Sequence, residues 1–258
     1  MDDVLKKLRR QIVLATVAAN EGHIPSSFCV LEILWVLYDR VLRVNPTDPA
    51  AETRDRFVLS KGHASLALYA VLAEKGFFPA QELEGFATAN SRLGGHPDGR
   101  KVPGVEASTG SLGHGFPMAV GMAMALRRKG NGARVFVLVG DGECNEGTVW
   151  EAALLGAHHK LDNVTVIVDY NHSTDAALSL ADVASKFESF GWEAENVDGH
   201  DLPALYAALS RRSSGRPRVV VAETIKGFGC RRMQTDPGAW HHGAPKPGDL
   251  VSILEELS

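Results

Sequence analysis

Runs of apolar, often β-branched residues recur along the chain and alternate with segments of helical periodicity. Residues 135–139 and 164–168 are almost continuously apolar, which is typical of strands buried on both faces of a parallel sheet. Further strands are predicted at residues 57–60, 192–197 and 218–224. This alternation predicts an α/β fold with a doubly wound, mostly parallel sheet and helices on both of its faces.

The segments between the strands predict the helices. Residues 3–20 have the apolar spacing of an amphipathic helix, and Ser26 or Ser27 is expected to cap a second helix that ends near Val41. Residues 85–110 are rich in Gly, Pro, Ser and His and predict a long functional loop. The other predicted helices cover residues 64–76, 112–129, 149–161, 183–190 and 202–212.

Length and composition bound the organisation. The 258 residues, 45% of them hydrophobic, suit one domain over residues 1–258, with a loop-rich tail from about residue 227. The formal net charge is -4 and no long basic run occurs, so binding to nucleic acid or to an anionic membrane is not expected.

Targeting signals are also not expected. No apolar stretch reaches the ~18 residues of a membrane span. The first residues read as the acidic start of a helix rather than as a signal peptide. The three scattered cysteines favour a reduced, cytoplasmic protein.

Two polar segments follow the two most apolar strands. Asp141 lies in the turn Gly140–Gly147 after the first, and Asn171 follows the second. Because a right-handed strand-helix-strand unit brings both strand ends to one edge of the sheet, the two side chains are expected to converge there. Their oxygens and the following helix start predict a site for Mg2+ carrying a diphosphate. A Gly-Asp-Gly turn alone is ordinary turn chemistry, and the pairing with Asn171 is what favours the site.

Histidines are concentrated in the predicted loops and turns. A lone loop histidine is usually solvated, but several at one sheet edge could hydrogen-bond phosphates and move protons near neutral pH. None shows the spacing of a metal-binding motif. The loop and turn histidines are His23, His63, His96, His114, His172, His241 and His242.

Many short motifs, in order over nearly the whole chain, resemble transketolase, and in particular the N-terminal, diphosphate-binding subunit of a split transketolase. They are Gly22-His23, Ser60-Lys61-Gly62-His63-Ala64, Gly95-His96-Pro97-Asp98, Ser108-Thr109-Gly110-Ser111-Leu112-Gly113, the turn Gly140–Gly147, Trp150-Glu151-Ala152-Ala153, Lys160-Leu161-Asp162-Asn163, Asp198-Gly199-His200-Asp201 and Thr224-Ile225-Lys226-Gly227.

The resemblance implies the thiamine diphosphate-binding fold and a cofactor held by Mg2+, or by Ca2+ or Mn2+. The implied metal ligands are Asp141, the side chain of Asn171 and the carbonyl of Ser173. The implied cofactor-binding residues are His63, Ser111, Leu112, Gly140, Gly142 through its N–H, Glu143, Asn171 and His241. The implied catalytic residues are His23 and His96 at the substrate, Glu146 in a carboxylate network across the subunit interface, and His242. Which of His241 and His242 contacts the diphosphate stays open, with His242 favoured.

The resemblance further implies transfer of a two-carbon ketol unit from a ketose or ketose phosphate donor to an aldose acceptor. In the family, the carboxylate that activates the cofactor lies on the pyrimidine-binding domain. A partner C-terminal subunit carrying that domain, in a heterotetramer (α₂β₂), is therefore implied, and this chain alone should be inactive. Residues 112–129, with Met118, Met122 and Met124, could supply part of the interface or simply pack in the core.

Three segments depart from the usual family pattern and put the substrate, rather than the cofactor, in question. They are Ile24–Ser27, His114 and Asn171–Thr174. Two other interpretations remain. The α subunit of a 2-oxo acid dehydrogenase shares the Gly-Asp-Gly turn, but the motifs Ser60–Ala64 and Gly95–Asp98 argue against it. A catalytically silent scaffold protein would have no need for Asp141, Asn171 and His63.

Overall fold

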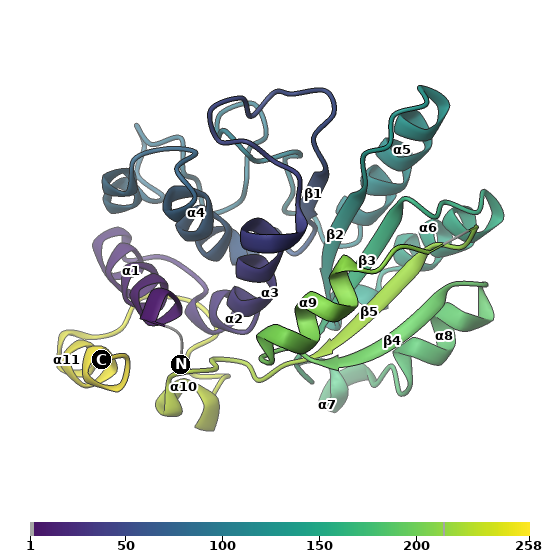
Figure 1. The fold of residues 1–258 in the computed structure, drawn as a ribbon. Helices are drawn as coiled ribbons and strands as arrows, with labels where there is room; N and C mark the ends of the chain where they lie inside the picture. Colours follow the sequence, from purple (N-terminus) through teal and green to yellow (C-terminus); the bar gives the residue numbers. More distant parts are fainter. Residues whose placement is uncertain (1–2, 214) are drawn as a thin grey trace.

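A parallel sheet lies at the centre of the computed structural model, which describes residues 3–213 and 215–258 (Figure 1). The strand order is β1-β2-β3-β5-β4, and each neighbouring pair is parallel. The strands are β1 (Arg56–Leu59), β2 (Val135–Gly140), β3 (Val164–Tyr170), β4 (Glu193–Asp198) and β5 (Arg218–Glu223). The predicted α/β fold is confirmed, with strand boundaries within one or two residues of the expected ones.

Alternate residues of the central strands enter two different hydrophobic clusters. In β2, Phe136 and Leu138 belong to one cluster, and Val135, Val137 and Val139 belong to the other. Every residue of β2 and β3 is buried. This two-sided burial explains why both strands are continuously apolar in sequence rather than alternating.

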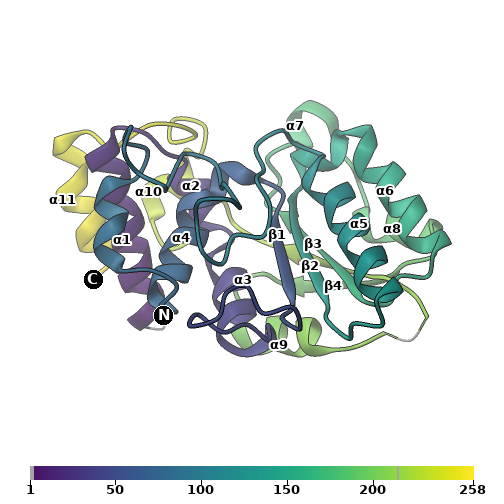
Figure 2. The ribbon, with the colours of Figure 1, turned by 90° about the horizontal axis from the view of Figure 1, so that it is seen from above.

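Helices cover both faces of the sheet, as predicted (Figures 1 and 2). The cluster on one face includes side chains of α1 (Asp3–Ala19), α2 (Ile24–Phe28), α3 (Leu31–Val36), α4 (Ser65–Glu74) and α9 (Leu202–Ser210). The cluster on the other face includes side chains of α5 (Gly115–Arg128), α6 (Gly147–His158) and α8 (Val183–Ser189).

The single helix predicted from Ser26 or Ser27 to Val41 is wrong. The segment forms α2, α3 and a π-helical turn over Leu37–Val41, and neither serine caps α2, which begins at Ile24 with Pro25 in its first turn. Residues 24–34 are all buried, so the sequence offers no polar stripe that would mark where one helix ends and the next begins.

The helix predicted from residue 112 begins three residues later, at Gly115. Gly113 has φ +80°, a left-handed conformation that ends helical geometry there. Its N–H donates to the carboxylate of Glu143 at 2.9 Å, which holds this turn against the end of β2. In α5, Phe116 and Ala119 pack in the core, whereas Met118 is 37% exposed on the opposite side.

The tail is loop-rich as predicted, although it contains the short helix α10 (Arg231–Thr235) and leads into α11 (Pro247–Glu256). It returns to the first helices, because Gly227 donates its N–H to the Pro25 carbonyl at 3.2 Å and Gly243 donates to Gly22 at 2.9 Å. Another short helix, α7 (Asp175–Leu178), was not predicted. The three cysteines are free and buried. Among the described residues, no helix has the length and apolar character needed to cross a membrane.

Candidate functional site

A cavity of about 150 Å³ lies at the carboxyl ends of four strands. Lys61 follows β1, Asp141 follows β2, Asn171 follows β3 and Lys226 comes shortly after β5. This is the sheet edge at which open α/β sheets bind ligands, and it is the edge the sequence predicted. The full lining is Ser26, Lys61, His63, Leu112, Gly140, Asp141, Gly142, Glu143, Asn171, Ser173, Lys226 and His241.

Asp141 and Asn171 both line this cavity. The Asp141 carboxylate is 2% exposed and accepts hydrogen bonds from the N–H groups of Gly142 at 2.7 Å and Thr174 at 3.4 Å. Burial raises its pKa above the ordinary aspartate value, and the charge of Asp169 adds to the rise. A carboxylate held in this way gains from a nearby cation, which favours its ionised form.

The Asn171 side chain is oriented by hydrogen bonds at both ends. Its Nδ2 donates to Asp169 at 2.8 Å, and its Oδ1 accepts from the Ser173 N–H at 3.2 Å and from the Ser173 hydroxyl. Because the amide nitrogen faces a carboxylate, the oxygen is the end that lies on the side of Ser173. An oxygen ligand is therefore presented where the sequence predicts a metal.

Asp169 forms the buried base of the site. Its carboxylate pairs with the Lys61 ammonium and accepts from Thr224 and from the Cys29 thiol. Burial alone would lower the pKa of Lys61 and raise that of Asp169, but the attraction between the two charges reverses both shifts. Lys61 therefore stays protonated beneath the cavity.

Glu143 also lines the cavity, but its two carboxylate oxygens are already bonded. They accept from the Ser60 hydroxyl and from the N–H groups of Gly113 at 2.9 Å and Gly140 at 3.1 Å. Burial raises its pKa. The side chain joins the ends of β1 and β2 to the turn before α5, which indicates a structural contribution to the site.

Four histidines gather beside the cavity. The ring of His23 lies 5.3 Å from that of His63, 5.8 Å from His241 and 4.7 Å from His242. Burial, with the charges of His242, His241 and His96, lowers the pKa of His23 to about 4. His23 is therefore neutral near pH 7, the form that can both donate and accept a proton.

His241 lines the cavity, and its Nδ1 lies 3.3 Å from the Lys226 ammonium. His242 instead packs against His23. For contact with a group in the cavity, this geometry favours His241 over the sequence preference for His242.

Several predicted site residues do not line the cavity. His23 and His242 flank it, whereas His96, Ser111 and Glu146 are exposed. His96 lies on the long loop against Gly110, and Glu146 precedes α6. Their predicted roles toward substrate, cofactor and subunit interface remain predictions.

Three further residues line the cavity although the sequence suggested no role for them, and they are Lys61, Lys226 and Ser26. Both lysines stand inside family-like motifs just after a strand end, and that position was the available signal. Among the described residues, no group of three or more His, Cys, Asp and Glu side chains could hold a metal. The predicted ligand set does not need one, because it combines a single carboxylate with amide and carbonyl oxygens.

These residues fit a divalent ion and a diphosphate. The buried carboxylate of Asp141 and the oriented oxygen of Asn171 match the oxygen ligands that Mg2+ takes, usually alongside substrate phosphates. Lys61, Lys226 and the neighbouring histidines supply the cationic and hydrogen-bonding groups that a diphosphate requires.

Comparisons with known proteins agree with this geometry. Residues 2–256 match the family described as transketolase, thiamine diphosphate binding domain. One of the two subunits named for the apulose-4-phosphate transketolase of Actinobacillus succinogenes is 40% identical over 98% of this chain and 94% of its own length. The 6-deoxy-6-sulfo-D-fructose transketolase subunit SqwG of Clostridium sp. is 38% identical over 81% of this chain and 78% of its own.

Solved structures extend the agreement. The transketolase of Campylobacter jejuni superposes with a TM-score of 0.88 and 30% identity, over 99% of this chain and 42% of that one. A transketolase variant from Pichia stipitis also gives 0.88 and 30%, over 98% of this chain and 39% of the other. The present chain thus spans about two fifths of those transketolase chains.

Proposed function

This chain belongs to the transketolase family through its thiamine diphosphate-binding domain, and from that premise we propose that it is the diphosphate-binding subunit of a split transketolase. It would transfer a two-carbon ketol unit from a ketose or ketose phosphate to an aldose, together with a partner subunit that carries the pyrimidine-binding domain. A heterotetramer with two copies of each subunit is the proposed assembly. Two relatives whose names call them transketolase subunits support a division of the enzyme between chains.

The observation that carries the proposal is the cavity at the strand ends. It brings Asp141 and Asn171 together with Lys61, Lys226 and His63 around one small space. Oxygen ligands beside cationic groups form a site for a metal-bound diphosphate rather than for an apolar ligand. A scaffold protein without cofactor would leave the buried charge of Asp141 without compensation.

The residues of this chain would bind and orient the cofactor. When bound, thiamine diphosphate supplies an electron sink for carbon–carbon bond chemistry. Asp141, the amide oxygen of Asn171 and the carbonyl of Ser173 would hold Mg2+. Lys61 and Lys226 would offset the diphosphate charge, and His63 and His241 would donate hydrogen bonds to it.

On the substrate side, neutral His23 would accept and return a hydroxyl proton of the sugar, with His96 acting from the long loop. Glu146 would extend a carboxylate network toward the partner. The names of two relatives include a phosphate and a sulfo group. We propose that the donor here is likewise a ketose with an anionic end. Ser26 and Ser173 come from segments that depart from the usual family pattern, and both line the cavity.

Calorimetric titration with thiamine diphosphate tests the proposal. The chain should bind the cofactor with Mg2+ present and lose that binding with EDTA. Asp141→Ala should abolish the Mg2+-dependent part without unfolding the chain. Asp175→Ala removes a neighbouring carboxylate, 35% exposed and outside the cavity lining, and should bind as the unchanged chain does. Equal affinity in both variants would reject the metal assignment, and no binding under any condition would favour the scaffold interpretation.

A further inference from the structure

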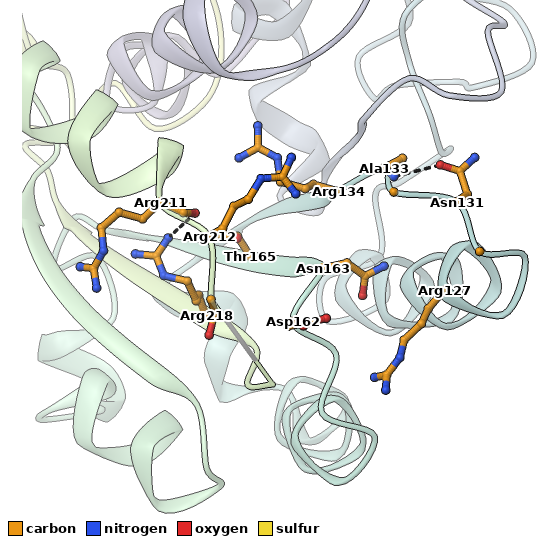
Figure 3. A pocket seen from close by; sticks show the side chains of 13 residues that line it. Arg127, Asn131, Ala133, Arg134, Asp162, Asn163, Thr165, Arg211, Arg212 and Arg218 are labelled. Carbon is orange, nitrogen blue, oxygen red and sulfur yellow. Dashed lines mark hydrogen bonds between the residues drawn. The ribbon is translucent and has the colours of Figure 1, made fainter.

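A second cavity, of about 270 Å³, lies at the opposite edge of the sheet, where the strands begin. Arg134 precedes β2, Asn163 precedes β3 and Arg218 opens β5. The lining includes five arginines, which are Arg127, Arg134, Arg211, Arg212 and Arg218, and a single carboxylate, Asp162. Figure 3 shows the side chains of Arg134, Arg212 and Arg218 around one opening, with Arg211 and Arg127 on opposite sides of it.

Unpartnered polar atoms are concentrated in this cavity. Four side-chain polar atoms of the described residues are buried without a hydrogen-bond partner, and three of them belong to lining residues. They are Nε of Arg134, Oδ1 of Asn163 and Oγ of Ser213. Since buried polar groups are almost always bonded, this concentration indicates that a ligand supplies the missing partners.

The orientation of the Asn163 amide is fixed. Its Nδ2 donates to the Ala123 carbonyl at 3.0 Å, so the free atom is the oxygen, an acceptor. The free Nε of Arg134 is a donor, and its two other nitrogens already bond the carbonyls of Leu209 and Val41. The cavity therefore calls for a ligand that accepts hydrogen bonds at one end and donates one at another.

Positive charge is in excess around this space. Asp55 is shared by Arg43 at 2.9 Å and Arg134 at 3.5 Å, and Glu195 lies 2.8 Å from both Arg211 and Arg218. Within the part of the chain that the structure describes, Arg212 has no hydrogen-bond or ion-pair partner. Burial lowers the pKa of Arg134, and the charge of Arg212 contributes to the lowering. The single lining carboxylate, Asp162, already accepts from the Gly215 N–H at 3.2 Å.

We propose that this cavity, which we term the arginine cavity, is a second binding site, for a small phosphate-bearing anion with a free hydroxyl group. Guanidinium groups match the oxygens of a phosphate in geometry as well as in charge. Arg212 and the Nε of Arg134 would hold the phosphate, the Ser213 hydroxyl would donate to it, and Asn163 Oδ1 would accept from the ligand hydroxyl. The volume lies just below the ~300–1,000 Å³ of sites for drug-sized ligands, which favours a small ligand.

The arginine cavity is distinct from the first site and does not rest on the proposed function. The strand β2 carries Arg134 before its first residue and Asp141 after its last. Seven residues of strand at ~3.3 Å each place the two about 23 Å apart. An anion bound at one edge of the sheet therefore does not occupy the other.

Calorimetric titration with inorganic phosphate and with glycerol 3-phosphate tests the assignment, with ionic strength held constant by chloride. Arg212→Gln removes a cation that has no partner to lose, so it should leave the fold intact and weaken phosphate binding about tenfold, equivalent to about 1.4 kcal/mol. Arg128→Gln is the matched control, because Arg128 is equally an exposed arginine and does not line the arginine cavity.

Phosphate could also enter the first cavity, so the titration is repeated with Lys226→Gln. Binding that falls in Arg212→Gln and persists in Lys226→Gln supports the proposal. Binding that is absent, that is equal in Arg212→Gln and Arg128→Gln, or that is lost only in Lys226→Gln overturns it. Tighter binding of glycerol 3-phosphate than of inorganic phosphate supports the role of Asn163, and equal affinities reject that part of the assignment.

Discussion

His63 has a strongly perturbed pKa, which gives a test of the site that needs neither cofactor nor partner. Burial, with the charges of Lys61 and His23, lowers its pKa from 6.5 to about 2. Below pH 6.5 the unfolded chain binds a proton here and the folded chain does not, so the free energy of unfolding falls as the pH falls. We predict that His63→Gln reduces this slope by up to about 1.4 kcal/mol per pH unit between pH 6.5 and 5.

Denaturant titrations at stepped pH would measure that slope, with His159→Gln, an exposed histidine beside the end of α6, as the matched control. An unchanged slope in His63→Gln would show that the residue is not held neutral by the fold.

His63 and His96 should affect different kinetic parameters in the active assembly. His63 lines the cavity at the strand ends, whereas His96 is exposed on the long loop. We therefore expect His63→Ala mainly to weaken cofactor affinity, and His96→Ala mainly to lower kcat/KM with cofactor saturating. Kinetics at graded cofactor concentrations would separate the two. Loss of cofactor affinity alone in both variants would contradict the division.

At the residue scale, the motifs located most of the cavity lining, including Asp141, Asn171 and His63. They gave no role to Lys61 because a lysine in a turn is ordinarily solvated, whereas here its side chain is only 2% exposed. Burial of that kind depends on Asp169, more than a hundred positions away in sequence, and local pattern does not reveal it.

At the element scale, the Lys61–Asp169 pair ties two strands that are not neighbours. Lys61 follows β1 and Asp169 lies in β3, with β2 between them, and the lysine stem passes near Gly140. Removing one member leaves a buried charge, so we predict that Lys61→Met costs about 3–5 kcal/mol of stability.

The double variant Lys61→Met with Asp169→Leu removes both charges and should be more stable than the sum of the single changes predicts. Urea unfolding of the four chains in this cycle gives the coupling. The double variant should still lose Mg2+-dependent cofactor binding, because Asn171 Nδ2 would lose its acceptor. Additive single effects would show that the pair is not coupled.

Helices and strands were predictable where one face is polar or where two-sided burial makes a run continuously apolar. The helical segment from Ile24 to Val41 was divided incorrectly because it is mostly buried and its pattern has no phase. Its break is tied to the site, since Cys29, just after α2, bonds Asp169 beneath the cavity. A tertiary contact of this kind overrides local helical preference.

At the scale of the whole molecule, the order of elements along the sequence predicted a doubly wound sheet and the edge at which ligands bind. It did not predict how the tail closes on the first helices. The bond from Gly243 to Gly22 helps bring His241 and His242 beside His23, and that approach depends on a return of the chain over more than two hundred residues. The arginine cavity was likewise not predicted, because its residues come from four separate connections.

The size of the first cavity leads to a prediction for the whole enzyme. Its volume of about 150 Å³ lies well below the ~300–1,000 Å³ of sites that bury drug-sized ligands. It suits the diphosphate end of the cofactor and leaves the remainder to be covered by another surface. We therefore predict that the purified chain transfers no ketol unit alone, and that transfer appears when a partner with the pyrimidine-binding domain is added.

The assay uses a ketose phosphate donor, an aldose acceptor, thiamine diphosphate and Mg2+, with each chain alone and then with both. The Asp141→Ala chain mixed with the partner is the control, and it should remain inactive because the ligand for Mg2+ is gone. Activity that rises with partner concentration to a plateau would match an assembly of fixed stoichiometry. Full ketol transfer by the isolated chain would contradict the requirement for a partner while leaving the metal and diphosphate assignments to the Asp141 control.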